Sequence, residues 1–513
     1  MKIDFKGKKI YLDISDKILE SRIKEILKGA VFVDSESLAD IRFSDREKDG
    51  YIYVNFIKRD FLGFVRHFLK DLYRLYFYKG IYFVFNRYSK EDYDRLYHIL
   101  FTLISLFFVF LAIPPDDLLR HLVAYRYYYD YSKVFIDANM PSWNFYLPFD
   151  IIVGFFHQFW HSIGSYFSVD FITYRMPIVS VNLIVFFLVF YLVNVAFKDY
   201  PLVYRAFFIS LFYFVSSGRF FLARPTVFAS LLFLIAVVMF LQKREKQGLF
   251  FSGLIGLFYY LNFLYFIPLL FFSRKVIFVA VASFIYWTFI AYFQGHSFYI
   301  LDVYKYILTL NNDAVIVGEN FSILLAFSKP VLVLVLILVF LYFKDVDRRY
   351  IYSSLWFSIS NQIRYFEVIG PLLVFSLANK IKEGFLDKVL KGSYFSIFIL
   401  SLSLFMASSS FFINSDLPDK KICDYVYDKK VKATLGGNFR LVYMCENVKV
   451  NPSMEIRWNK DLSLDLAILE GKDLCNEKLY KYDYLYLNSL KGFNSCLKME
   501  YGDGKWILWR VIK

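Results

Sequence analysis

The feature that most constrains this chain is a series of apolar segments that runs from residue 98 to residue 412. Of the 513 residues, 58% are hydrophobic and 22% are aromatic, which is typical of a polytopic α-helical membrane protein with soluble parts. A membrane span needs about 20 apolar residues, or fewer where protein covers it, so we predict about eleven spans. The predicted segments are 98–114, 177–197, 202–217, 226–242, 249–260, 262–272, 276–294, 330–344, 351–362, 366–380 and 393–412.

Loop charge predicts the orientation of these spans. With a cytoplasmic N-terminus, the basic loops fall inside, as the positive-inside rule requires. These loops are 243–246, 273–275, 347–349 and 380–391. The assignment requires that two apolar regions, 249–272 and 351–380, are each a pair of short spans rather than one long helix. Because such loops account for the net charge of +14, no nucleic-acid partner is expected.

Soluble segments flank the spans. Residues 1–96 are polar enough to form a small cytoplasmic α/β domain, although they contain no catalytic motif. We predict strands at 9–14, 30–33 and 51–56, a helix from 15 to about 29, and an amphipathic helix at 59–78. Residues 97–412 form the membrane domain. No cleavable signal peptide is predicted, because the first apolar span begins only behind the polar segment.

All four cysteines fall in the last segment, 413–513. An even number of cysteines in one soluble segment predicts two disulfides and an oxidising, extracytoplasmic compartment. The spacing leaves the pairing open and does not resemble a zinc site. The cysteines are Cys423, Cys445, Cys475 and Cys496. Short alternating runs at 440–444 and 506–511 predict a mostly β or α+β domain.

Two adjacent carboxylates, Asp116 and Asp117, open the first outer loop, 115–176, directly after the first span. Charged residues at the mouth of a membrane helix are costly and seldom accidental. Each can act as a general base toward a hydroxyl or help to hold a divalent cation. The alternative is that the sequence Pro-Pro-Asp-Asp only caps a helix. His121, one turn after Asp117, can orient a carboxylate or a substrate.

The same loop contains an apolar stretch, 149–167, that holds His157, Gln158 and His161. We predict that it is a helix lying in the membrane interface, with these side chains as its polar residues. Trp143 precedes it and can stack on a sugar ring or anchor the loop at the interface.

Five arginines fall at the outer ends of predicted spans, where the positive-inside rule disfavours them. They are Arg120, Arg175, Arg219, Arg224 and Arg364. Guanidinium groups bind phosphate oxygens bidentately and keep their charge at any working pH. We therefore predict a shared anionic ligand, such as a lipid phosphate, and the alternative is that the side chains extend toward lipid headgroups.

These motifs together resemble the GT-C glycosyltransferases over residues 98–412. The run 116–121 is similar to the Asp-Asp-x-x-Arg-Tyr run of some members. Arg175-Met176-Pro177 resembles the Arg-x-Pro of the protein-mannosyltransferase and lipid A aminoarabinose-transferase branch, as does Arg364-Tyr365 followed by Pro371-Leu372. One place departs from the pattern: many members have an acidic residue between spans three and four, where this chain has 219–224.

The resemblance implies an integral membrane glycosyltransferase of the plasma (inner) membrane that builds a cell envelope glycan. Its donor would be a sugar on a polyprenyl phosphate, and its acceptor a hydroxyl of a glycan, lipid or protein. Asp116 or Asp117 would deprotonate the acceptor, with inversion at the anomeric carbon. The arginines and Tyr365 would bind the leaving lipid phosphate. No cofactor is implied, or a divalent cation (Mg²⁺ or Mn²⁺) if the Asp pair binds one.

Two other functions are compatible with parts of the sequence. A transporter or flippase of an anionic lipid-linked substrate would also need outer arginines, but it would normally show polar residues near the bilayer midplane and repeated halves. The predicted spans are apolar at their centres. A non-catalytic membrane scaffold would explain the two end domains but not the Asp pair.

Overall fold

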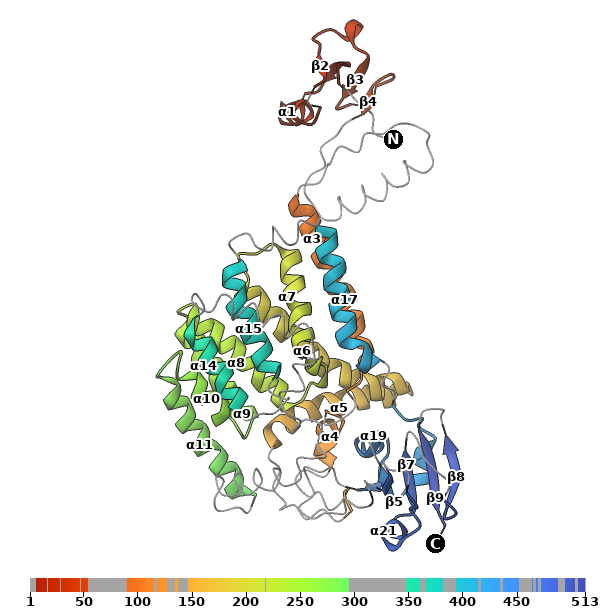
Figure 1. Ribbon diagram of the computed structural model, residues 1–513. Coiled ribbons are helices and arrows are strands. Elements are labelled where there is room, and N and C mark those ends of the chain that lie inside the picture. Colours follow the sequence, from red (N-terminus) through yellow and green to blue (C-terminus); the bar gives the residue numbers. More distant parts are fainter. Residues whose placement is uncertain are drawn as a thin grey trace. The chain divides into compact units, whose positions relative to one another are not determined.

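The computed structural model contains two compact units, residues 1–93 and 94–513 (Figure 1). It describes residues 6–15, 17–27, 29–46, 48–53, 90–114, 118–126, 134–136, 146–216, 218–294, 347–359, 366–381, 394–413, 417–433, 437–451, 464, 467–468, 472–487, 494–502 and 506–512.

The first unit is a small α/β fold with a parallel sheet in the order β2-β1-β3-β4. Its elements are β1 (Lys9–Asp13), α1 (Lys17–Ile26), β2 (Val31–Phe32), β3 (Ile41–Ser44) and β4 (Ile52–Tyr53). The predicted strands and first helix are confirmed, while the predicted helix 59–78 lies outside the described residues. Strand β3 is not predicted from the sequence, because its two apolar residues, Ile41 and Phe43, are too few to show a strand pattern.

The second unit is built around a helical bundle. Its helices are α3 (Lys90–Leu111), α4 (Leu118–Val123), α5 (Leu147–Phe167), α6 (Met176–Ala196), α7 (Leu202–Val215), α8 (Pro225–Leu241), α9 (Glu245–Phe258), α10 (Phe263–Leu269), α11 (Val276–Phe293), α14 (Arg348–Ile359), α15 (Phe366–Ile381) and α17 (Tyr394–Ile413). Each predicted apolar segment within the described residues coincides with a helix, and segment 330–344 lies outside them.

Three helical stretches among the described residues are long and apolar enough to cross a membrane. They are Asp94–Leu111, Phe171–Ala196 and Val276–Phe293. This pattern indicates a helical membrane protein. The pair 249–272 is two separate helices, α9 and α10, because the chain leaves the helical conformation at Tyr259. Helix α10 rises only about 10 Å, which is well short of the hydrocarbon core of a bilayer.

Several of the described helices end or begin at one end of the bundle, and we refer to it as the bundle end. Helices α3, α7 and α17 finish there, and α6, α8 and α15 begin there (Figure 1). The backbone N–H of Ile113 donates to the carbonyl oxygen of Phe412 at 3.0 Å, which joins the ends of α3 and α17. At Gly370 in α15, an added Cβ would lie 2.7 Å from the side chain of Val215, so only glycine allows these helices to approach so closely.

Helix α5 lies across the bundle end (Figure 1). Its buried side includes Val153, Gly154, His157 and Gly164, which recur at helical spacing. Its other side is apolar yet exposed, with Ile151, Ile152, Phe155, Phe159 and Phe167. An exposed apolar stripe on a helix that crosses the end of a bundle fits the predicted position in the membrane interface.

The C-terminal part of the second unit is a five-stranded mixed sheet in the order β6-β5-β7-β9-β8. Its strands are β5 (Lys430–Ala433), β6 (Lys449–Val450), β7 (Tyr484–Leu487), β8 (Leu497–Gly502) and β9 (Ile507–Val511), and its helices are α18 (Ile422–Val426), α19 (Gly437–Met444) and α21 (Glu477–Tyr480). The α+β prediction and the strand at 506–511 are confirmed. The interpretation of 440–444 as an alternating run is wrong, because these residues belong to α19, where Leu441, Val442 and Tyr443 are all buried.

Both predicted disulfides are present, and the structure resolves their pairing. Cys423 is bonded to Cys445, which ties α18 to the end of α19. Cys475 is bonded to Cys496, which ties the segment before α21 to the start of β8. Each bond closes a short loop of the C-terminal domain, so each restricts the unfolded chain locally.

We predict that removing either disulfide destabilises the C-terminal domain. The bonded residues are 22 and 21 positions apart, for which loop-closure entropy gives about 3 kcal/mol each. The paired serine variants at 423/445 and at 475/496 should both have a lower Tm than the wild type. Thiol labelling of the denatured, unreduced wild type should find no free thiol, and four labelled thiols would contradict the assignment.

Candidate functional site at the bundle end

The C-terminal end of α3 is held by side chains from the segment that enters α6. Arg175 donates from Nε and Nη2 to the carbonyl oxygen of Phe110, at 3.2 and 3.0 Å, and also bonds the carbonyl of Leu111. The amide Nδ2 of Asn182 donates to the carbonyl of Ala112 at 3.1 Å. The last carbonyls of a helix have no partner within it, so these bonds fix where α3 ends.

Helix α4, which follows the Asp pair, is held by a buried bond between His121 and Asp150. The imidazole Nδ1 lies 2.5 Å from the carboxylate Oδ1, and the two side chains are only 2% and 4% exposed. A carboxylate can only accept, so Nδ1 of His121 donates this hydrogen bond and leaves Nε2 for a second contact. The Arg120 Nη2 lies 3.5 Å from that Nε2. The imidazole ring also makes T-shaped contacts with the rings of Tyr146 and Phe149, with ring centres 5.0 and 5.3 Å apart.

Arg120 connects α4 to the C-terminal domain. Its side chain is buried, and its guanidinium carbon lies 5.6 Å from the ring centres of both Tyr146 and Phe439. Such cation–π contacts are stronger when the cation is withdrawn from water. Since Phe439 belongs to α19, Arg120 joins the first loop to the C-terminal sheet. Arg126 makes a second link, because its Nη1 donates to the carbonyl of Val442 at 3.2 Å.

A second buried polar cluster surrounds Glu367 at the start of α15. Its side chain is 1% exposed, and Oε2 lies 3.5 Å from Nε of Arg219. The hydroxyl of Ser230, in α8, donates to Oε1 at 2.9 Å. That hydroxyl is also 3.0 Å from the phenol oxygen of Tyr265. The carboxylate is therefore both hydrogen-bonded and paired with a cation, as a buried charge requires.

Aromatic contacts join the two polar clusters into one region. The rings of Phe149 and Phe228 are 5.3 Å apart, which places the start of α5 against the first turn of α8. The rings of Tyr146 and Tyr260 are also 5.3 Å apart. Arg224 is the residue before α8, one turn ahead of Phe228, and its side chain is buried.

The structure brings five of the predicted site residues to the bundle end. They are Arg120, His121, Arg175, Arg219 and Arg224. The other five, Asp116, Asp117, Trp143, Arg364 and Tyr365, lie outside the described residues. The contacts of Arg175 and Arg219 given above are to protein groups, which gives these two side chains a role in holding the fold.

His157 differs from its predicted place as a polar interfacial residue. Its side chain is fully buried, with its ring 5.4 Å from that of Tyr443 and 5.5 Å from that of His161. Burial, together with the charges of Arg126 and His161, lowers the pKa of His157 to about 3. The imidazole is therefore neutral at physiological pH and acts as a packing group between α5 and α19.

Asp150 and Glu367 are buried acids that the sequence analysis did not single out. Both stand in otherwise apolar segments, 149–167 and 366–380. An ionisable residue within an apolar helix is itself a signal, because it is expensive to bury without a partner. That signal identifies both positions, but it does not identify their partners, since 29 residues separate His121 from Asp150 and far more separate Arg219 from Glu367.

We predict that breaking the Glu367–Arg219 pair is strongly destabilising. Removing one member of a buried pair leaves the other charge uncompensated, which typically costs about 3–5 kcal/mol. Glu367→Ala should therefore lower the Tm of the detergent-solubilised protein, and the exposed control Glu446→Ala should not. Adding Arg219→Leu to Glu367→Ala should recover part of the loss. A double variant as unstable as the sum of both single variants would contradict the pairing.

No protein-family model, curated protein or solved structure matches this chain.

Proposed function

We propose that this protein is a GT-C-type glycosyltransferase that transfers a sugar from a polyprenyl-phosphate donor to an acceptor hydroxyl at the outer face of the plasma membrane. One observation supports this most strongly. In the sequence, Asp116 and Asp117 are flanked on both sides by backbone that polar side chains hold, and these flanks lie at the bundle end with Arg219, Arg224 and Glu367.

The anchoring of the flanks favours a catalytic role over a simple helix cap. Asp116 is two residues from Pro114 and two residues from Leu118, so its Cα lies within about 7.6 Å of the Cα of each. Pro114 follows the end of α3 that Arg175 and Asn182 hold, and Leu118 opens the helix that His121 holds. A cap requires only one carboxylate near free N–H groups, whereas a base requires accurate placement relative to its substrate.

In the proposed reaction, the Asp116 carboxylate removes the proton from the acceptor hydroxyl. The acceptor oxygen attacks the anomeric carbon from the face opposite the leaving phosphate, which gives inversion. Asp117 orients the acceptor. A base of this kind contributes about 10²–10⁴-fold to the rate.

The leaving lipid phosphate gains negative charge, so it requires cations near it. We assign this role to Arg364 and Arg224. Arg364 directly precedes Tyr365, as in the family's late motif, and is three residues from Glu367. Arg224 lies at the first turn of α8, beside the Phe149 contact. Arg175 and Arg219 instead hold the backbone and Glu367, and Arg120 holds α4 against α19.

Glu367 supplies a carboxylate beside Arg219, in the region where many family members carry an acid between spans three and four. Within the described residues, no three acidic, histidine or cysteine side chains form a group that could hold a metal ion.

We further propose about eleven spans, with residues 1–96 cytoplasmic and 413–513 outside. Helix α3 is about 33 Å long by its 22 residues. The C-terminal domain follows α17 in the chain, and the end of α17 lies beside the end of α3 that is remote from Lys90, because the backbone N–H of Ile113 donates to the carbonyl of Phe412.

Reporter fusions at residue 90 and at the C-terminus test this topology. An alkaline-phosphatase-type reporter, active only outside, should be active at the C-terminus and inactive at residue 90, and a reporter active only in the cytoplasm should give the opposite result. If both positions report the same compartment, the number of spans is wrong. The five arginines would then no longer all lie at the outer ends of spans.

Substitution of the Asp pair tests the chemistry. An amide has the shape of a carboxylate but cannot take the proton, so Asp116→Asn should lower sugar transfer by at least about 10²-fold. Asp117→Asn should have a smaller effect. The assay is transfer from a polyprenyl-phosphate donor in membranes, with the sugar identified beforehand by glycan analysis of a deletion strain.

The matched control for this assay is Asp473→Asn, an exposed carboxylate in the C-terminal domain. All variants should reach the membrane at wild-type amounts. An active Asp116→Asn with an inactive Asp117→Asn would exchange the two roles. Near-normal transfer by the double variant would mean that the Asp pair only caps α4.

A further inference from the structure

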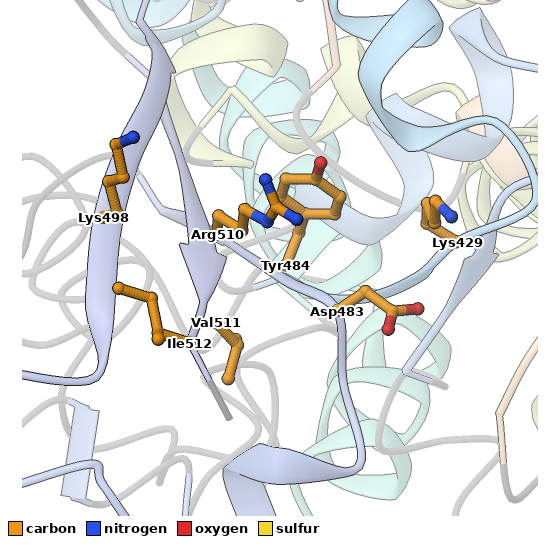
Figure 2. Close-up of a pocket in the computed structure, with 7 residues that line it drawn as sticks. All are labelled: Lys429, Asp483, Tyr484, Lys498, Arg510, Val511 and Ile512. Carbon is orange, nitrogen blue, oxygen red and sulfur yellow. The ribbon is translucent and has the colours of Figure 1, made fainter.

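The C-terminal sheet contains a hollow of about 430 Å³ that none of the preceding chemistry uses. We refer to it as the basic pocket. Its lining residues are Lys429, Asp483, Tyr484, Lys498, Arg510, Val511 and Ile512 (Figure 2). Three of these side chains are cationic and one is a carboxylate, and the volume is within the range of small-ligand pockets.

Strand register places the cations in a row on one face of the sheet. Arg510 lies directly opposite Tyr484 on one side and Lys498 on the other, and directly opposite residues share a face. Lys429 is two residues before Val431, which lies opposite Tyr484, so Lys429 shares that face as well. Like charges directly opposite each other, as at Lys498 and Arg510, destabilise a sheet unless an anion lies between them.

The single carboxylate of the basic pocket, Asp483, offsets one of the three cations, so the lining keeps a net positive charge. Oδ2 of Asp483 also accepts the backbone N–H of Lys430 at 2.9 Å. Glu500, which is not among the lining residues, contributes to raising the pKa of the Tyr484 phenol through its negative charge. Burial is the main cause that raises the pKa of Tyr484, so the phenol keeps its proton and can donate a hydrogen bond. The pocket thus offers cations, a hydroxyl donor and a flat ring.

The basic pocket faces away from the bundle end. Strand β5 begins beside it at Lys430 and runs toward α19, which packs on α4 through Phe439 and Arg120. The end of β9 lies on the side of the C-terminal domain that is remote from the helices of the bundle (Figure 1). A ligand of this pocket therefore comes from the aqueous phase rather than from the membrane surface.

We propose that the basic pocket binds an oxyanion-bearing sugar residue of a water-soluble saccharide chain. The guanidinium of Arg510 and the ammonium of Lys498 contact the oxyanion, a carboxylate or a phosphate, and the ring of Tyr484 packs against the sugar. Guanidinium geometry matches either oxyanion bidentately. That this saccharide is the acceptor of the transferase rests on the proposed function, whereas the binding itself does not.

Calorimetric titration of the purified full chain in neutral detergent tests the proposal. The probes are glucose 6-phosphate and glucuronate, with glucose and inorganic phosphate as comparisons. At least one charged sugar should bind at least about tenfold tighter than both comparisons. Which one does so distinguishes a phosphorylated from a uronic-acid saccharide. Charged sugars that bind no tighter than glucose, or no tighter than inorganic phosphate, would overturn the proposal.

Variants of the basic pocket give the second part of the test. Arg510→Gln and Lys498→Gln should each weaken binding roughly 10- to 100-fold, as expected for the loss of a charge-assisted hydrogen bond. Arg510→Lys should fall between wild type and Arg510→Gln. The exposed control Lys449→Gln, on β6, should bind like the wild type, and an equal loss in this control would reduce the effect to net charge and overturn the proposal.

Two further experiments complete the test. The first distinguishes a soluble saccharide from a lipid headgroup as the source of the anion, and the second distinguishes failure of the basic pocket from failure of the glycosyltransferase proposal. Binding should be the same in nanodiscs of phosphatidylglycerol and of phosphatidylcholine, and competition by the anionic lipid would assign the pocket to headgroups instead. Because binding is measured without transfer, intact binding with no transferase activity would count against the glycosyltransferase proposal alone. Transfer without binding would count against the basic pocket alone.

Discussion

A polar group buried among apolar helices is stable only when it is hydrogen-bonded, and the bond between His121 and Asp150 meets that requirement at the bundle end. It fixes α4 against α5 directly after the Asp pair. It also orients the imidazole toward Arg120, whose guanidinium lies between Tyr146 of the first loop and Phe439 of α19. The contact between the C-terminal domain and the bundle thus depends on the same few side chains that hold α4 against α5.

The contribution of the Glu367–Arg219 pair differs from that of the His121–Asp150 bond, because it is an ion pair between two full charges. Replacing a buried ion pair by apolar residues of similar volume is often neutral or even stabilising, so stability alone does not explain why a pair occupies this position. The pair joins the turn before α8 to the start of α15, two segments that the chain brings together from far apart in sequence. Each segment adjoins in sequence one of the arginines that we assign to the lipid phosphate.

The hydrophobic pattern predicts the helices, because the length of an apolar segment is visible in the sequence itself. The even number of cysteines in one soluble segment likewise predicts two disulfides. The partners of the arginines are not predictable in this way. Arg175 resembles a phosphate ligand in the sequence, yet it bonds the last carbonyls of α3, a contact set by how α6 packs. Helix α19 was hidden for a related reason: burial between α4 and the sheet makes three consecutive residues apolar, so neither helical nor strand periodicity is visible at 441–443.

The first loop and the C-terminal domain also share backbone hydrogen bonds. Ile136 donates to the carbonyl of Val450, and Val450 donates to that of Val134, so the loop adds to the sheet beside β6. The two segments must therefore lie in the same compartment, whichever side that is. In the proposed topology that compartment is the outside, which is where disulfides normally form and persist. In this proposed topology, the exposed apolar stripe of α5 would face lipid, so a lipid-linked donor would approach along α5 and a soluble acceptor from the side of the sheet.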